Sequence, residues 1–153
     1  MDKVGHAYTA YNLSRLSFRT WEWAGVKHKK AVLLAGFSGL AYQTVIETLD
    51  GYSTQWGWSW SDIGSNTIGV GLWMGQELLW KKQRVRLKLS AHYNKYGDKQ
   101  LQDRTNDFFG SVFTERLFKD YNAQTYWLSA NLHDFNNQLP VPKWLNIAVG
   151  YGA

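Results

Sequence analysis

Apolar positions in the first half of the chain recur every three or four residues, which is the period of an α-helix. Residues 2–23 contain no proline, and Gly5 is their only glycine. Residues 31–49 form a nearly continuous apolar run, followed by Gly51 at a place where a glycine often ends a helix. Residues 62–80 repeat the helical pattern. The pattern therefore predicts three apolar helices in this half.

The second of these helices has the length and apolar character of a membrane segment. At ~1.5 Å per residue, residues 31–49 would extend roughly 28 Å, close to the hydrocarbon thickness of a bilayer. Gln43 and Glu47 would be costly against lipid, which favours a buried core helix. Whether this helix and the one over residues 62–80 lie in lipid or in a protein core stays open at this point.

The third helix is rich in glycine, which lowers its intrinsic helix propensity by about 1 kcal/mol per glycine relative to alanine. Its glycines are Gly64, Gly69, Gly71 and Gly75. Close approach of a neighbouring helix is the usual compensation, and Gly71 and Gly75 have the spacing of a small-xxx-small contact. We therefore expect this pair at a helix–helix interface.

The second half of the chain changes to the two-residue alternation of β-strands. Val85, Leu87 and Leu89 alternate with charged or polar residues. Residues 94–110 are polar and rich in turn-forming residues, so we expect a mobile loop there. Residues 113–121 predict a short amphipathic helix. The predicted strands comprise residues 85–92, 126–132 and 145–151.

These patterns together predict a mainly α fold. Three apolar, glycine-faced helices form its N-terminal half, and a smaller β-containing region forms its C-terminal half. We place a helical domain over residues 1–82 and a mixed β and loop region over residues 83–153, packed on it as one structural unit. A chain of 153 residues has the size of one ordinary domain.

Aromatic residues are unusually frequent and point to a contact surface. The chain has 9 Trp, 9 Tyr and 7 Phe, which makes 16% of its residues aromatic. Such rings are favoured where one end is apolar and the other is wet, as at interfaces and membrane headgroups. Trp56, Trp58 and Trp60 lie in a segment rich in Gly and Ser, and Trp80 ends the third helix. We predict that these tryptophans contact a membrane or a protein partner.

The placement of the basic residues fits either a solvated basic rim or a membrane-proximal surface, and fits a nucleic acid less well. The net charge is +5, with three lysines in residues 27–30 and five basic residues in residues 81–88, as beside membrane-proximal helices. No RNP-like, helix-turn-helix or zinc-finger pattern accompanies this charge, so nucleic acid is not an expected partner. The chain has no Cys, which excludes disulfides, thiolate metal sites and Cys nucleophiles.

Polar residues interrupt the three apolar helices at positions that share a helix face. Asp2 and His6 are four residues apart on the first helix, and Asp62 and Asn66 are four apart on the third. Small and polar residues recur in the same way on the second helix. We expect these faces to meet in a buried polar cluster of Asp2, His6, Glu47, Asp50, Asp62 and Asn66.

The helix dipoles divide the carboxylates of this cluster into two kinds. Asp2 and Asp62 lie at helix N-termini, where free N–H groups stabilise a negative charge. Glu47 and Asp50 lie in the last turn of the second helix, where each is disfavoured by roughly 0.3 to 1 kcal/mol. This pair needs a compensating partner, either protonated His6, a Lys or Arg from elsewhere, or a divalent metal.

Three interpretations of the cluster remain open. It is a satisfied structural network, a metal or ligand site, or a catalytic site in which Glu47 is the general base and His6 is the acid or a metal ligand. The metal ligands in the second interpretation are Asp2, His6, Glu47, Asp50 and Asp62. Oxygen ligands with one His suit Mg²⁺, Mn²⁺, Ca²⁺ or Zn²⁺ without choosing between them. No nucleophile elbow or phosphate-cradling loop indicates a substrate.

Several segments resemble a bacterial family over nearly the whole chain. They are DKVGHA (2–7), IETLDG (46–51), WGWSWSD (56–62) with Asn66 and Gly69, GQELLW (75–80) and KDYNAQTYW (119–127). The family is domain-of-unknown-function family 2279, predicted periplasmic lipoproteins common in Bacteroidota. The order of the Asp, His, acidic pair and Asn residues is also similar to the VanZ-like membrane family. The resemblance implies a cell-envelope location, in the periplasm or at the outer membrane, and no established activity.

Two functions follow as hypotheses. The first is a non-catalytic cell-envelope protein, associated with a membrane or forming a subunit of an outer-membrane complex. The second is a metal-dependent hydrolase or transferase acting on lipid or cell-wall material through its His, Asp and Glu residues. Met1 is followed directly by Asp2 and Lys3 and not by an apolar segment. We therefore expect either a cytoplasmic protein or part of a longer precursor, and the resemblance favours the precursor.

Overall fold

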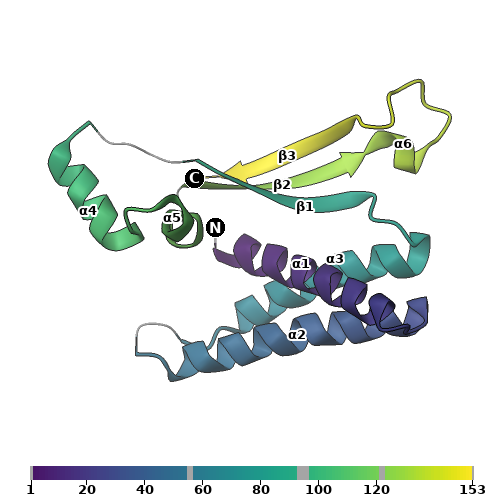
Figure 1. The fold of residues 1–153 in the computed structure, drawn as a ribbon, viewed down its shortest axis with the longest axis horizontal. Coiled ribbons are helices and arrows are strands. Elements are labelled where there is room, and N and C mark those ends of the chain that lie inside the picture. The colour runs from purple at the N-terminus through teal and green to yellow at the C-terminus, as the bar shows by residue number, and fades with distance from the viewer. Residues whose placement is uncertain (1, 55–56, 93–96, 121–122, 153) are drawn as a thin grey trace.

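Three long helices lie on one side of the molecule and a three-stranded sheet on the other (Figure 1). The structure is a computed structural model that describes residues 2–54, 57–92, 97–120 and 123–152. Its elements are α1 (Asp2–Trp23), α2 (His28–Tyr52), α3 (Trp60–Trp80), β1 (Val85–Ala91), α4 (Lys99–Phe109), α5 (Phe113–Lys119), β2 (Gln124–Asn131), α6 (Leu132–Phe135) and β3 (Asn146–Gly152). The predicted mainly α fold with a smaller β-containing C-terminal half is confirmed.

Helices α2 and α3 form an antiparallel hairpin, and α1 lies across it. Gly36 near the start of α2 faces Met74 near the end of α3, and Gly51 at the end of α2 faces Trp58 just before α3. α1 lies between this hairpin and the sheet (Figure 1). The side of the hairpin that faces away from α1 therefore has no further layer over it in the described part of the chain.

Glycine removes the side chain where α1 crosses the other two helices. A Cβ on Gly39 would lie 2.3 Å from Ser14 Oγ, and a Cβ on Gly69 would lie 2.1 Å from the carbonyl oxygen of Ala7. Real Cβ atoms do not approach other atoms so closely, so both positions require glycine. These two contacts bring the backbones of all three helices close together and confirm that the helices are glycine-faced.

The expected interface role of Gly71 and Gly75 is wrong within this chain. A Cβ on either residue would meet no atom within 4 Å, and the same holds for Gly64. The spacing of glycines identifies a smooth stripe on a helix but not the side of the helix that a neighbour covers. On α3 the neighbours cover Gly69, and the other three glycines lie on the open side.

The sheet has the order β1-β2-β3 and is antiparallel throughout. Leu128 in the central strand lies opposite Leu87 on one side and Val149 on the other. Residues of β1 alternate between half-buried and exposed, as the sequence pattern predicts, whereas every residue of β3 is exposed. The three predicted strands are confirmed with small shifts at their ends.

The side chain of Gln76 on α3 connects the helices to the sheet. Its amide oxygen accepts a hydrogen bond from Val85 N (2.8 Å), and its amide nitrogen donates to Val85 O (2.9 Å). It therefore pairs with the first residue of β1 as a neighbouring strand would. Gln83 adds a bond to Tyr11 Oη (3.0 Å), which ties α1 into the same network.

The mobile loop expected over residues 94–110 is wrong for residues 99–109, which form α4. Asp98 caps the start of this helix by accepting a hydrogen bond from Gln100 N (2.9 Å), and Gly110 ends it with φ 87°. Both residue types also favour turns, and no residue of α4 is buried. Leu101, Phe108 and Phe109 share one side of this helix, and with the caps they were the sequence signals that its polar, turn-favouring residues outweighed.

Helix α2 combines membrane-like composition with an exposed apolar side. In the described ranges it is the one helix long and apolar enough to cross a membrane, judged by length and composition, and only 33% of its most apolar window is buried. Large apolar side chains are also exposed on the open side of α3. The term outer face is used below for one set of exposed apolar residues on α2 and α3: Leu33, Phe37, Val45, Leu49, Ile68 and Leu79.

Candidate functional site

The positive partner of Glu47 is the beginning of α3. Glu47 is 1% exposed, and its Oε1 accepts a hydrogen bond from the backbone N–H of Ser59 at 2.6 Å. Because the hairpin is antiparallel, the end of α2 lies beside the N-terminus of α3, where free N–H groups attract a carboxylate. The donor is therefore none of the expected cations, and Glu47 forms no ion pair with His6 among the described residues.

Ser59 and Asp62 form half of the capping box that their spacing suggests. Ser59 is the N-cap of α3, and its Oγ accepts a hydrogen bond from Asp62 N at 3.3 Å. In a complete box the carboxylate three residues on would accept the N–H of the cap residue. Here Glu47 accepts it. The Asp62 carboxylate is consequently free to face α1.

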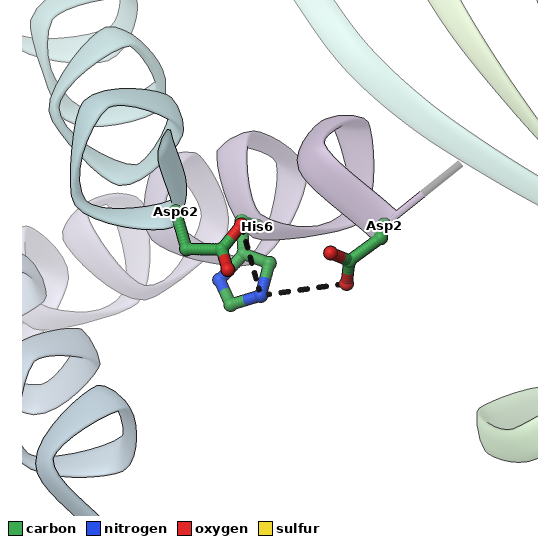
Figure 2. Close-up of side chains that lie close together, drawn as sticks. All are labelled: Asp2, His6 and Asp62. Atoms are coloured by element: carbon green, nitrogen blue, oxygen red, sulfur yellow. Dashed lines mark ion pairs between the residues drawn. The ribbon is translucent and has the colours of Figure 1, made fainter. Parts of the chain in front are cut away.

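Asp62 meets His6 of α1 (Figure 2) and also Lys3 of the same helix. Lys3 donates from its ammonium group to Asp62 Oδ1 in a very short ion pair, and His6 Nε2 lies 3.8 Å from the same oxygen. Asp2 Oδ1 lies 3.6 Å from His6 Nε2, and Asp2 Oδ2 lies 3.1 Å from Lys3 Nζ. Two carboxylates, one imidazole and one ammonium thus gather where α1 and α3 begin.

The protonation of this group follows from its contacts. Burial raises the pKa of Asp62, but the hydrogen bonds from Lys3 and Ser59 and the charge of His6 more than offset burial and leave that pKa below its ordinary value. The hydrogen bond to Asp62 raises the pKa of Lys3 in turn. Lys3 therefore stays charged and balances the carboxylates at neutral pH.

The geometry allows a metal ion at Asp2, His6 and Asp62, whose ligand atoms lie within 4.8 Å of one another. Two carboxylates with one imidazole are a ligand set that Zn²⁺ or Mn²⁺ accepts. Lys3 already binds both carboxylates, so a metal would have to displace its ammonium group. The metal-binding and catalytic roles assigned to these residues stay predictions.

The six residues of the predicted polar cluster do not share one environment. Glu47, Asp62 and Asn66 are buried, His6 and Asp50 are half-buried, and Asp2 is exposed. Asn66 accepts a hydrogen bond from Gln43 Nε2 at 3.0 Å, while its own Nδ2 is buried without a partner in the described structure. The expectation of a buried cluster is therefore wrong for Asp2. Asp2 is the first residue of α1, and its side chain is 57% exposed.

A cavity of about 570 Å³ adjoins this cluster. Residues of α1, the second half of α2, β1, α5 and β2 line it, and they include Asp2, His6 and Asp50. Asp50 therefore lies near His6 across a cavity, although it forms no ion pair with His6 among the residues described. Glu47 does not line the cavity. The two acidic residues at the end of α2 therefore lie in different surroundings.

The predicted contact tryptophans lie at both ends of the hairpin. Trp58 and Trp60 pack edge to face with ring centroids 5.4 Å apart and are 42% and 77% exposed. Trp80, at the other end, stacks under the guanidinium group of Arg84 at 4.5 Å. Trp56 lies outside the described residues. Trp58 and Trp60 are thus available for contact, while Trp80 is partly covered.

Sequence reasoning missed two features of the site. Lys3 was read only as part of a motif, yet it is the cation that binds Asp62. Gln83 was missed as well, although its Nε2 donates to Glu77 Oε1 at 2.8 Å beside Tyr11, whose pKa burial raises to about 12. A Lys next to a helix-starting Asp was an available signal for the first. The second depends on a side-chain contact between α3 and the chain that follows it, for which the sequence holds no pattern.

Comparison with known proteins identifies the helical part of the chain. The model of family DUF2279, described as predicted periplasmic lipoprotein, matches residues 1–75. Neither the curated proteins nor the solved structures include a match to this chain. The family description fits a cell-envelope protein, and no comparison supports the VanZ-like similarity. Residues 1–75, which contain the cluster of Asp2, His6 and Asp62, therefore match the DUF2279 family of predicted periplasmic lipoproteins.

Proposed function

We propose that this chain is a non-catalytic cell-envelope protein that docks on a membrane through the outer face of the α2–α3 hairpin. The observation that carries the proposal is the exposure of that face: Phe37 is 72% exposed, Ile68 69% and Leu79 75%. Adjacent large apolar side chains on a protein surface mark a contact with a protein or a membrane. The family description supports an envelope location for it.

The ends of the hairpin support a membrane as the partner. Exposed Lys29 and Lys30 begin α2, and exposed Lys81 and Lys82 follow α3, so these lysines gather at one end of the antiparallel pair. The exposed rings of Trp58 and Trp60 lie at the other end. Lysine and tryptophan are the residues that favour the headgroup region beside an apolar surface. A protein partner would have no need of this distribution.

A vesicle-binding experiment tests the proposal. The full chain is expected to sediment with vesicles that contain anionic lipid, and Phe37→Glu is expected to weaken that binding about tenfold because it places a charge in the apolar contact. Phe108→Glu on α4 is the matched control, since Phe108 is 70% exposed and lies outside the outer face. Absence of vesicle binding, or equal losses in both variants, would contradict membrane docking.

The second candidate function is a metal-dependent hydrolase or transferase acting on lipid or cell-wall material. The convergence of Asp2, His6 and Asp62 favours it, and the ion pairs of Lys3 oppose it. Elemental analysis of the purified chain decides between the metal-dependent enzyme and the non-catalytic protein. Stoichiometric metal, together with a higher unfolding temperature on adding Zn²⁺ or Mn²⁺, would support the enzyme. If Lys3→Met is also needed before metal binds, the native cluster is an ion-pair network.

A further inference from the structure

The cavity beside α1 and α2 is acidic in a protein whose net charge is +5. Asp2 and Asp50 line it, together with His6, and none of its described lining residues is a Lys or an Arg. Its volume of about 570 Å³ lies within the roughly 300 to 1,000 Å³ of small-molecule sites. Lys3, which lies outside this lining, pairs with Asp2, so Asp50 is the lining carboxylate without a paired cation in the described structure, which favours a cationic occupant.

Asp50 lacks the partner that its position demands. It is half-buried in the last turn of α2, beside the negative end of the helix dipole, which disfavours its charge. Its carboxylate accepts no hydrogen bond and forms no ion pair with any residue that the structure describes. Glu47, one turn earlier, has its partner in Ser59. A cation in the cavity would supply the same compensation for Asp50.

A neutral acceptor reinforces the Asp50 carboxylate. Gln43 is 5% exposed and lines the cavity, and its Nε2 donates to Asn66. That bond leaves the amide oxygen Oε1 without a donor among the described residues. Because Gln43 lines the cavity, a ligand or water there can donate to that oxygen. An ammonium group has three N–H donors, so it can donate to Asp50 and to this amide oxygen while Asp2 stays paired with Lys3.

The remaining walls suit a carbon chain. Ile46 from α2, Leu89 from β1 and Leu117 from α5 line the cavity, and the ring of Tyr42 borders it. Apolar walls with a few placed polar groups are typical of small-molecule sites, and a tyrosine ring attracts a cation through its π face. The polar and apolar parts together describe a ligand with a charged head and an aliphatic body.

We propose that this cavity is a binding site for an alkylammonium group. Asp50 holds the charged nitrogen with Gln43 on the same helix, and Ile46, Leu89 and Leu117 enclose its carbon chain. The site lies on a different side of α2 from the outer face, because Gln43, Ile46 and Asp50 follow one another at helical spacing away from Phe37. Ligand binding and membrane docking are therefore independent and can be tested apart.

Calorimetric titration of the full chain with n-octylammonium, kept below its micelle concentration, tests the site without membranes. Saturable binding of one molecule per chain is expected, at least tenfold tighter than binding of n-octanol or octanoate, because only the ammonium matches the acceptors. Asp50→Asn is expected to weaken the binding about tenfold. Equal binding of octanol and octylammonium would overturn the proposal, since a plain apolar crevice would behave in that way.

Asp107→Asn is the matched control, because it removes the same charge from the exposed side of α4 and lies outside the cavity lining. If it weakens octylammonium binding as much as Asp50→Asn does, the attraction is non-specific and the proposal fails. Asp50→Asn is expected to unfold at the same temperature as the unliganded parent chain or at a higher one, since it removes an unpaired charge from the end of α2. A clear loss of stability would make Asp50 a structural residue and would also overturn the proposal.

The source of the ammonium group is found by competition. Monomeric short-chain phosphatidylethanolamine, which carries a primary amine, is added to the octylammonium complex beside its N-acetylated derivative, which carries none. Displacement by the amine lipid alone assigns the site to an aminolipid headgroup. If neither lipid displaces octylammonium, the site is assigned to a soluble amine. Both of these results support an ammonium site. Equal displacement by both lipids would contradict it, because the charge would then not matter.

Discussion

The two sides of the α2–α3 hairpin both depart from those of an ordinary soluble helix pair, because the inner side buries polar side chains beside its apolar core and the outer face exposes apolar ones. The buried inner side carries polar Gln43, Glu47, Asn66, Gln76 and Glu77 next to apolar Ala31, Val32, Ala35, Val70 and Trp73. The outer face, which is exposed, consists of Leu, Phe, Val and Ile side chains. Soluble helices usually bury the apolar side and expose the polar one. The contrast teaches that the inner side determines how these helices pack, while the outer face has to be explained by a contact outside the described chain.

The inner side specifies one arrangement of the helices. The bond from Gln43 to Asn66 is 3.0 Å long, and the bond from Ser59 to Glu47 is 2.6 Å long. Each joins α2 to the chain at or just before α3, so sliding one helix along the other would break both. Glycine contacts with α1 add a steric condition at Gly39 and Gly69. The outer face has no comparable pairing, and single changes there are expected to leave the fold intact.

The largest effect is expected from Gly69→Ala on the inner side. The added Cβ would meet the backbone of Ala7, with the carbonyl oxygen 2.1 Å away, so α1 would have to move off the hairpin. Overpacking that shifts a backbone costs about 3 kcal/mol of unfolding free energy, which exceeds the gain in helix propensity. Urea unfolding of the full chain measures it. An unchanged midpoint would show that the two sides of α3 do not differ in packing.

Glu47→Gln is expected to produce the next largest loss, about 2 kcal/mol, because it replaces a buried charge-assisted hydrogen bond to Ser59 with a neutral one. The same unfolding measurement applies. Glu115→Gln on α5 is a useful control, since it removes an exposed carboxylate of the same kind. If Glu47→Gln stabilised the chain, the free-energy cost of burying the Glu47 charge would exceed the stabilisation that the N-terminus of α3 gives to it.

Gly71→Ala, two residues from Gly69, is expected to act in the other direction. Its Cβ would meet no atom within 4 Å, so only the gain in helix propensity remains, about 1 kcal/mol of added stability. The comparison of Gly69→Ala with Gly71→Ala therefore reports on the two sides of one helix with the same chemical change. If Gly71→Ala also destabilises the isolated chain, a contact that the chain makes with its own copies covers this side.

The sequence predicted the elements whose signals are local. Apolar periodicity predicted α1, α2 and α3, and alternation predicted all three strands, because both patterns arise within a single element. Helix α4 was missed because polar and turn-favouring residues outnumber its three apolar ones, Leu101, Phe108 and Phe109, although these share one side of the helix. Its caps, Asp98 and Gly110, could have identified it.

Contacts between elements were harder to predict. Spacing correctly placed Asp2 and His6 on one face of α1 and close to Asp62, since residues four apart share a helix face. The partner of Glu47 was out of reach, because a backbone N–H has no signature in the sequence. For the same reason the sequence could not distinguish Gly69, which α1 covers, from Gly71, which lies open.

The smallest effect is expected at Asp62, at the edge of the inner side, and it depends on pH. The pKa of Asp62 is lowered in the folded chain from an ordinary value of 3.8, so its ion pair with Lys3 stabilises the fold fully above about that pH. The contribution is lost as the pH falls further, through the lowered pKa, because the carboxyl group then takes up a proton. Asp62→Asn should therefore be less stable than the parent chain at pH 7, and the difference should shrink at pH 3. Lys3 is about half exposed, so solvent screens the pair and keeps the difference small.

A difference that is equal at both pH values would show that the Asp62 charge does not contribute, and that only the capping and packing of the inner side hold α1 in place.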